Sequence, residues 1–414
     1  MTTSRRNHLF ALIGAYAALG LVYATFGYQA TWRLWGIPFG YPPFMDARVI
    51  TAGAIAEREG LDPMSSNPAD VAQRKLNYPR VWQALYRVGV NEHHGLALGL
   101  VFVGAFAVGT MLFVREPGGW TTGLLLAGIF SPAVMLGVER GNTDLLMFFL
   151  LAAAIVAAER STGLALAFVL AAFGLKLFPL AGLAVLLRRP REEAVRAIAI
   201  GLALVALYLL YNYSDLRAIR AGTPEGAWIA FGKDVIQLRL EFFRHPWAGE
   251  ARWVAWGVVL AVIGWSARSG LRRKEARLCA AVPMNLTAFR VGAACYLGAF
   301  VLGSNFDYRL AFLLFTIPQL TEWARGGSGA TWWARSTLGW LLLAMWGLAI
   351  EQATTGVARL EWSGFFVGEV ATWSLFGLVA VLFARSLPEW VAEMERGGAV
   401  EAQEARADAV ATTR

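Results

Sequence analysis

The sequence predicts an all-α protein that crosses a membrane many times, and three observations point to this fold class. Hydrophobic residues make up 57% of the 414 residues and only 16% are charged, whereas soluble domains have about 25% charged residues. The apolar runs are close to the ~20 residues that an α-helix needs to span a bilayer, and longer than the ~10 residues of a barrel strand. The net charge of +8 comes largely from arginines between these runs, which is typical of cytoplasmic loops. No soluble segment carries a basic stripe, so we expect no nucleic-acid partner.

The apolar runs predict about twelve spans, with both ends of the chain in the cytoplasm. The expected spans are residues 9–27, 95–114, 121–138, 145–158, two halves of 163–187, 197–211, 253–266, 286–302, 310–323, 338–349 with its flanks, and 369–383. Residues 1–388 then form the membrane domain, with extracytoplasmic loops at 28–94 and 212–250. Residues 389–414 are rich in Ala, Glu and Arg, which is typical of a flexible tail, here on the cytoplasmic side.

The run 163–187 is best read as two short helices. As one span it would place the four arginines of residues 188–196 outside, against the tendency of short basic loops to stay in the cytoplasm. Pro179 removes a helical hydrogen bond and disfavours helix for the residue before it. We therefore predict a break at Lys176, with two halves that meet near the outer face. The alternative is one tilted helix and inverted topology downstream.

The first loop, residues 28–94, is predicted to be an ordered extracytoplasmic cap. Loops beyond about 12–15 residues are usually functional or disordered, and this one has too many aromatic residues to stay solvated. Apolar residues at helical spacing follow Asp46, which predicts a juxtamembrane amphipathic helix over residues 47–59. Asp46 could cap this helix, or act as a catalytic base aimed into the membrane domain. Both interpretations remain open at this stage.

Polar residues gather at the expected outer ends of the helices. Ionisable side chains at membrane depth are costly and are candidates for function. Because these groups share one expected leaflet, they predict a single site. The groups are Asp46 and Arg48; Asn77, Tyr78, Pro79 and Arg80; His93 and His94; Arg140, Gly141, Asn142, Thr143 and Asp144; Lys176; and Asn305, Phe306, Asp307, Tyr308 and Arg309.

Each of these groups also has a structural interpretation. Lys176 could extend its amine to the membrane interface. Asn142 or Asp144 could cap a helix. The charges within residues 305–309 could form a surface pair that contributes little, and the two adjacent histidines could be interfacial residues only.

Residues 10–190 resemble the polyprenyl-phosphate-sugar-dependent glycosyltransferases of the GT-C fold, and are most similar to the bacterial mannosyltransferase-like family 87. The family's glycine–asparagine helix start resembles Gly141-Asn142, and its helix ending in Lys-x-x-Pro resembles Lys176-Leu177-Phe178-Pro179. In the first loop, the acidic residue after the first helix, the Gly-x-x-Pro turn and the later Tyr-Pro resemble Asp46, residues 60–63 and residues 78–79.

The resemblance implies an inverting hexosyltransferase in a bacterial cytoplasmic membrane, with its active site on the extracytoplasmic side. It would transfer a sugar, such as mannose, from a polyprenyl phosphate to a glycolipid or glycan acceptor, with membrane lipids around it. The resemblance implies that Asp46 is the general base. It requires no cofactor and no metal, because cations can stabilise the leaving phosphate. The implied phosphate-binding cations are Lys176, Arg309, Arg80, Arg140 and Arg48, and the implied substrate-binding residues are Asn142, Asp144, Tyr78, Asn77, Asp307, His93 and His94.

Two other classes of function compete with this expectation. A flippase or transporter of a lipid-linked sugar would need a polar path through the bilayer centre, but the expected spans carry few charges at mid-helix, and the sequence shows no internal repeat. A membrane scaffold without catalysis would leave the crowded first loop unexplained.

Overall fold

The computed structural model describes residues 2–115, 117–271, 278–326, 329–354 and 361–394. These residues form a bundle of helices, and their only strands are two segments of two residues each. Five of the described helices are long and apolar enough to cross a membrane, or six if one bent pair counts as a single span. The predicted all-α class is therefore confirmed, whereas the count of about twelve spans is not. Residues 395–414 of the predicted tail lie outside the described part of the chain.

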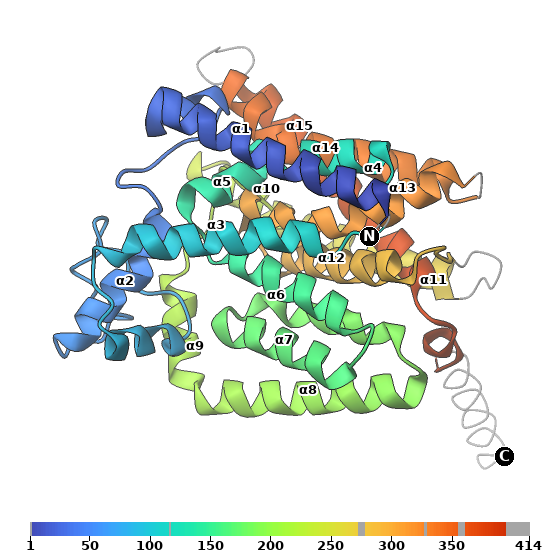
Figure 1. Cartoon of the computed structure of the whole chain (residues 1–414), viewed down its shortest axis with the longest axis horizontal. Coiled ribbons are helices and arrows are strands. Elements are labelled where there is room, and N and C mark those ends of the chain that lie inside the picture. The colour runs from blue at the N-terminus through green and yellow to red at the C-terminus, as the bar shows by residue number, and fades with distance from the viewer. Residues whose placement is uncertain (1, 116, 272–277, 327–328, 355–360, 395–414) are drawn as a thin grey trace.

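The first part of the chain forms a long helix and a helical cap. Helix α1 (Thr3–Leu34) runs across the bundle (Figure 1) and contains a non-helical residue, Gly27, with a φ of 75°. The predicted helix after Asp46 is α2 (Met45–Arg58), and the 3₁₀ helix η1 (Arg80–Val88) follows it. Helix α2 packs against both η1 and α3 (His94–Leu112), and the middle of α2 is buried. The first loop thus has its own packed interior.

Prolines divide two of the predicted spans into pairs of shorter helices. Residues 121–138 fall in α4 (Gly119–Ile129) and α5 (Pro132–Arg140), which are bent by 52° because the chain restarts at a serine cap followed by Pro132. Residues 163–187 fall in α7 (Thr162–Leu175) and the 3₁₀ helix η2 (Phe178–Arg188). Lys176 is extended between them, so the predicted break is confirmed.

The other elements complete the bundle, and two short strands tie the second loop to the end of α12. These elements are α6 (Asp144–Ala157), α8 (Arg191–Tyr211), α9 (Tyr213–Gly222), β1 (Ala230–Phe231), α10 (Val235–Phe242), α11 (Ala248–Leu271), α12 (Pro283–Leu302), β2 (Asn305–Phe306), η4 (Asp307–Thr316), α13 (Ile317–Arg325), α14 (Thr331–Thr354) and α15 (Glu361–Ser386). Strands β1 and β2 are antiparallel, with Ala230 opposite Phe306 and Phe231 opposite Asn305. This pairing holds the second loop beside residues 303–309.

Phenylalanine rings fill the centre of the bundle where α3, α6 and η4 meet. Phe148 of α6 stacks on Phe315 of η4 with ring centroids 4.2 Å apart, and Phe106 of α3 meets Phe148 edge to face at 4.9 Å. Such offset and edge contacts are favourable geometries for aromatic pairs. The layer fixes α6 against η4, and with them the polar residues at the beginnings of both helices.

The polar ends of the helices meet at one end of the bundle, where Figure 1 shows α2 and α9. Arg80 of η1 pairs with Asp215 of α9 at 2.9 Å, and Arg239 of α10 pairs with Glu351 of α14 at 2.8 Å. We call this end of the bundle, which holds α2, α9 and the β1–β2 pair, the polar end. The first loop and the segment of residues 212–250 therefore lie side by side at this end.

Candidate functional site

A cavity of about 1480 Å³ lies at the polar end and combines polar with apolar walls. The polar walls come from α2, the first loop, the end of α5, the break at Lys176 and the start of η4. They include Asp46, Arg74, Tyr78, Arg140, Lys176 and Arg309. The apolar walls come from η2, α8, α11 and α12, and include Leu180, Leu202, Leu209, Ile263, Leu297 and Val301. Two of these leucines are seven residues apart on α8, which is about 10 Å at 1.5 Å per residue. The apolar part of the cavity therefore extends along the helices.

Asp46 lies in the first turn of α2, and its carboxylate has partners outside that helix. Oδ1 is 3.0 Å from a guanidinium nitrogen of Arg74, and Oδ2 accepts a 2.7 Å hydrogen bond from the side-chain amide of Asn142. The N-cap residue is Phe44, and no side chain caps the helix. The interpretation of Asp46 as a helix cap is therefore wrong. Its side chain is 14% exposed and lines the cavity.

The Gly141-Asn142 pair links α2 to the break at Lys176. Gly141 has a φ of 56°, and a Cβ there would lie 2.8 Å from the Cβ of Phe44, so glycine suits both the left-handed turn and the close approach. This turn directs Asn142 between two charged groups. Its Nδ2 donates to Asp46, and its Oδ1 accepts a 3.1 Å hydrogen bond from Nζ of Lys176. One amide side chain therefore separates the carboxylate from the ammonium.

Lys176 is buried, because the break after α7 turns its side chain toward the start of α6. Its Nζ lies 2.5 Å from Oδ1 of Asp144 and 2.9 Å from the hydroxyl of Thr143. The same nitrogen lies 5.3 Å from the ring centroid of Tyr78 and 5.8 Å from that of Tyr308, within the range of cation–π attraction. The interpretation of Lys176 as a side chain that extends to the interface is therefore wrong.

Arg309 shares the same carboxylate with Lys176. Its Nε lies 3.3 Å from Oδ2 of Asp144, and its guanidinium carbon lies 4.8 Å from the ring centroid of Phe178. Arg309 therefore pairs with Asp144 of α6, and not with Asp307 as the structural interpretation of the sequence suggested. Two cations around one carboxylate leave a net charge of +1 beside the cavity.

Arg140 also lines the cavity and belongs to a cluster that fastens the loop before α2. Its Nε lies 3.1 Å from Oε2 of the buried Glu139. The other oxygen of Glu139 accepts a 2.5 Å hydrogen bond from the Tyr28 hydroxyl and a 2.8 Å hydrogen bond from the Gly40 backbone. The carboxylate therefore joins α1, α5 and residues 35–44, which lead into α2.

Asn77 and Tyr78 contribute the first-loop wall of the cavity. Burial raises the pKa of Tyr78 well above its ordinary value, with a further contribution from the charge of Asp46. The phenol therefore stays protonated and can donate a hydrogen bond. The structure thus brings six of the predicted residues to the wall of the cavity, with Asn142 and Asp144 bonded to them from behind.

The two other predicted phosphate-binding arginines lie elsewhere. Arg80 is 41% exposed in its side chain and bridges Asp62 at 3.3 Å and Asp215 at 2.9 Å. Arg48 donates from Nε to the backbone oxygen of Pro43 at 2.8 Å. Both arginines hold segments of the polar end together. Neither is among the residues that line the cavity, which corrects the expectation that they bind phosphate there.

Three predicted substrate-binding residues also lie outside the cavity. His93 is 84% exposed in its side chain, and His94 is bonded to Asn91 at the exposed start of α3. Asp307 has its pKa raised to about 8 by burial and by the charge of Glu351, so it is largely protonated at neutral pH. These positions follow from packing between distant segments, which local sequence does not reveal.

Arg74 also lines the cavity, and the sequence did not single it out. Arg74 contacts both Asp46 and Asp70. The four-residue spacing of Asp70 and Arg74 was visible, but such spacing is common among solvated charges and does not single out a site. Asn305 and Tyr308 also line the cavity. The sequence places both in the polar group of residues 305–309 without a role of their own, because their position becomes visible only when η4 is placed against α6.

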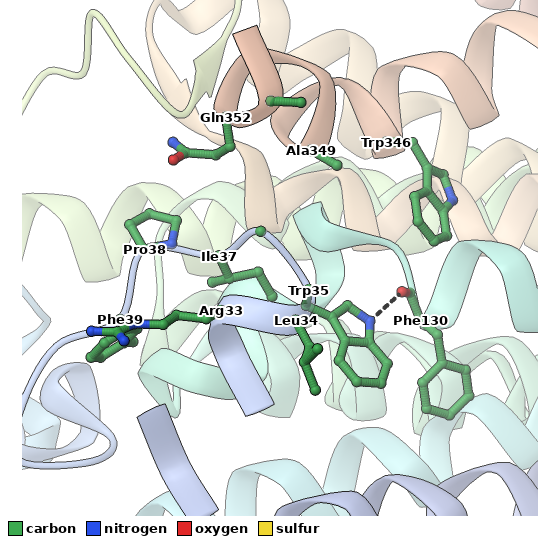
Figure 2. A pocket seen from close by; sticks show the side chains of 12 residues that line it. Arg33, Leu34, Trp35, Ile37, Pro38, Phe39, Phe130, Trp346, Ala349 and Gln352 are labelled. Carbon is green, nitrogen blue, oxygen red and sulfur yellow. Dashed lines mark hydrogen bonds between the residues drawn. The ribbon is translucent and has the colours of Figure 1, made fainter. Parts of the chain in front are cut away.

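A second cavity of about 810 Å³ lies between the end of α1 and α14. Figure 2 shows Trp35 and Trp346 on its walls, and the Trp35 indole donates a 2.9 Å hydrogen bond to the backbone oxygen of Phe130. Arg33 is the only charged residue among those that line it. Because it contains none of the predicted site residues, this cavity offers less chemistry than the cavity around Asp46.

The cavity around Asp46 presents a carboxylate, fixed cations and an extended apolar wall to one bound molecule. Such a combination can accept a proton at one atom and stabilise negative charge at another. Among the described residues, no group of three or more His, Cys, Asp or Glu side chains could hold a metal ion.

No protein-family model and no curated protein matches this chain. The chemistry of the site is therefore inferred from its residues.

Proposed function

We propose that this protein is an integral membrane glycosyltransferase that moves a sugar from a polyprenyl phosphate to a glycolipid or glycan acceptor, with inversion at the anomeric carbon. One observation carries the proposal: Asp46 and Lys176 lie in the same cavity on either side of Asn142, and that cavity continues along apolar helices. The resemblance of residues 10–190 to the GT-C glycosyltransferases of family 87 supports the same function. We place the enzyme in a bacterial cytoplasmic membrane, with the polar end on the extracytoplasmic side.

The two kinds of wall suit the two ends of such a donor. The prenyl chain would lie along the leucines and valine of α8, α11, α12 and η2. The phosphate would lie near Lys176 and Arg309. These two cations and Asp144 leave a net charge of +1, which matches the single negative charge of a phosphodiester. A hydrocarbon wall and a cationic end together favour an amphiphile over a free nucleotide sugar.

Asp46 would accept the proton of the acceptor hydroxyl as that oxygen attacks the anomeric carbon. The new bond joins the acceptor oxygen to this carbon, and the bond from the carbon to the phosphate oxygen breaks. The proton passes to Asp46, and the bonding electron pair leaves with the polyprenyl phosphate, which gains one negative charge. Attack opposite the leaving group inverts the configuration, and the transition state has oxocarbenium character, as in glycoside hydrolysis.

The cations on the far side of Asn142 would stabilise the departing phosphate. Lys176 would act through its positive charge, because its buried ammonium already donates to three oxygen atoms of the protein. Arg309 would support it, and Asp144 would hold both cations without touching the donor. Fixed donors aimed at a developing negative charge are usually the largest single contribution to catalysis.

The test is sugar transfer by purified protein in proteoliposomes with radiolabelled polyprenyl-phosphate sugars and a membrane-lipid acceptor extract. We compare the wild type with Asp46→Asn, and use His94→Ala as a matched control at the same end of the bundle. We expect transfer by the wild type and by the control, and loss of transfer by Asp46→Asn at equal protein content. Transfer by Asp46→Asn at the wild-type rate would remove Asp46 as the base. Movement of the donor across the bilayer without an acceptor would favour a flippase instead.

A further inference from the structure

We infer that Arg74 is a positioning residue for the proposed base: it transmits the fixed orientation of the buried Asp70 to Asp46. The inference rests on the proposed function and adds a residue that the sequence did not single out. It starts from a chain of three charged side chains, in which one guanidinium lies between two carboxylates. Only one of these carboxylates lines the cavity.

The Arg74 guanidinium donates hydrogen bonds to Asp70 on one side and to residues of α2 on the other. Toward Asp70 it forms two bonds, with Nε 3.1 Å from Oδ2 and a terminal nitrogen 3.1 Å from Oδ1. Toward α2 one terminal nitrogen lies 3.0 Å from Oδ1 of Asp46, and the other donates a 2.5 Å hydrogen bond to the backbone oxygen of Met45. A bidentate pair fixes the plane of the guanidinium and therefore the direction of its remaining N–H groups.

Asp70 is well suited to anchor this chain, because its side chain is only 1% exposed. Its Oδ2 also accepts hydrogen bonds from the backbone nitrogens of Ala72 at 3.1 Å and Arg74 at 2.9 Å. The Asn67 amide then ties the segment to α2, with hydrogen bonds to the backbone oxygens of Val49 and Arg74. Asp70 therefore cannot turn away without breaking the local fold of the loop.

Asp46 is consequently held from both sides. Arg74 fixes Oδ1, and Asn142 fixes Oδ2 from α5–α6. Each carboxylate oxygen has two lone pairs, so both can be bonded and still accept a proton from a substrate hydroxyl. Without Arg74 the carboxylate keeps one partner and can rotate about its side-chain bonds. A misplacement of about 1 Å can lower a rate by about 100-fold.

A direct role of Arg74 in binding the donor phosphate predicts a different result. The arginine lines the cavity and its side chain is 31% exposed, so a bound donor could reach it. Loss of a phosphate-binding cation raises KM for the donor. Loss of a positioning residue lowers kcat and leaves this KM nearly unchanged.

The experiment measures kcat and KM for a radiolabelled polyprenyl-phosphate sugar with the wild type, Arg74→Gln, Arg74→Ala and Asp70→Asn in proteoliposomes. Arg80→Gln is the matched control, because Arg80 also bridges two carboxylates at the polar end but lies outside the cavity. We expect Arg74→Gln to lower kcat by about 100-fold and to change KM by less than about 2-fold. We expect Asp70→Asn to lower kcat in the same way, and the control to keep kcat.

Added methylguanidinium should restore part of the activity of Arg74→Ala and none of the activity of Asp46→Asn, because only the first variant keeps the base. A kcat of Arg74→Gln equal to that of the wild type overturns the inference, and so does a loss that appears wholly in KM without rescue. Wild-type protein that transfers no sugar from any donor overturns the proposed function, and the inference with it.

Discussion

Replacing Lys176 by methionine separates the catalytic role of this cation from its structural role. Methionine keeps most of the side-chain length and removes the charge. We expect kcat to fall by about 100- to 1000-fold, because the loss of one fixed donor to a developing oxyanion typically costs this much. The donor should still bind along the apolar walls, which do not depend on the ammonium.

The contacts of Lys176 also allow an estimate of how much free energy of unfolding the Lys176→Met variant loses. The substitution removes the ion pair with Asp144 at 2.5 Å and the hydrogen bonds to Thr143 and Asn142 at 2.9 and 3.1 Å. Breaking a buried ion pair usually costs about 3–5 kcal/mol, because the remaining charge loses its partner. Here Arg309 still lies 3.3 Å from Asp144, so we expect about 3 kcal/mol, at the low end.

The assay combines donor turnover in proteoliposomes with thermal unfolding of the purified protein. Arg239→Met is the control, because Arg239 has a buried ion pair with Glu351 but does not line the cavity. The control should lose stability and keep kcat. Adding Asp144→Asn to the Lys176 variant should lower the unfolding temperature further and restore no activity, because Arg309 then loses its carboxylate partner as well.

A kcat of the Lys176 variant within a few-fold of the wild type, in protein that remains folded, would contradict the catalytic role of this cation. The catalytic role is also contradicted if the double variant regains wild-type activity, since the charge of Lys176 would then serve only to neutralise Asp144.

Three further predictions follow from single contacts. Gly141→Ala should lower Tm, because the left-handed conformation costs about 1–2 kcal/mol for a residue with a Cβ and that atom would lie 2.8 Å from Phe44; an unchanged Tm would contradict this. Gly298→Leu should raise KM for long-chain donors more than for short-chain donors, because the new side chain enters the apolar wall beside Ala181, where a Cβ has ordinary contact at 3.8 Å. Equal changes in KM would place the lipid elsewhere. His94→Ala should leave turnover and Tm unchanged, since this residue lies at the exposed start of α3; a large loss of turnover would restore it to the site.

Features that depend on a few neighbouring residues could be predicted from the sequence. Pro179 predicts the break at Lys176, because proline acts on the helix in which it stands. The apolar spacing after Asp46 predicts α2 for the same local reason. The number of membrane spans is harder to predict from the sequence, since α6, α7 and η2 are apolar but shorter than a full span. A hydropathy pattern does not distinguish a short buried helix from one that crosses the bilayer.

The sequence alone determined the helical class, the broken run and the grouping of polar residues at one end of the bundle. Only the tertiary structure decided which charges meet. Asp144 lies between Lys176 and Arg309 because phenylalanine packing sets α6 against η4. Arg74 reaches Asp46 because the first loop folds back on α2. Hydrophobic periodicity and proline act over a few residues, whereas an ion pair between distant segments exists only after packing has brought their backbones together.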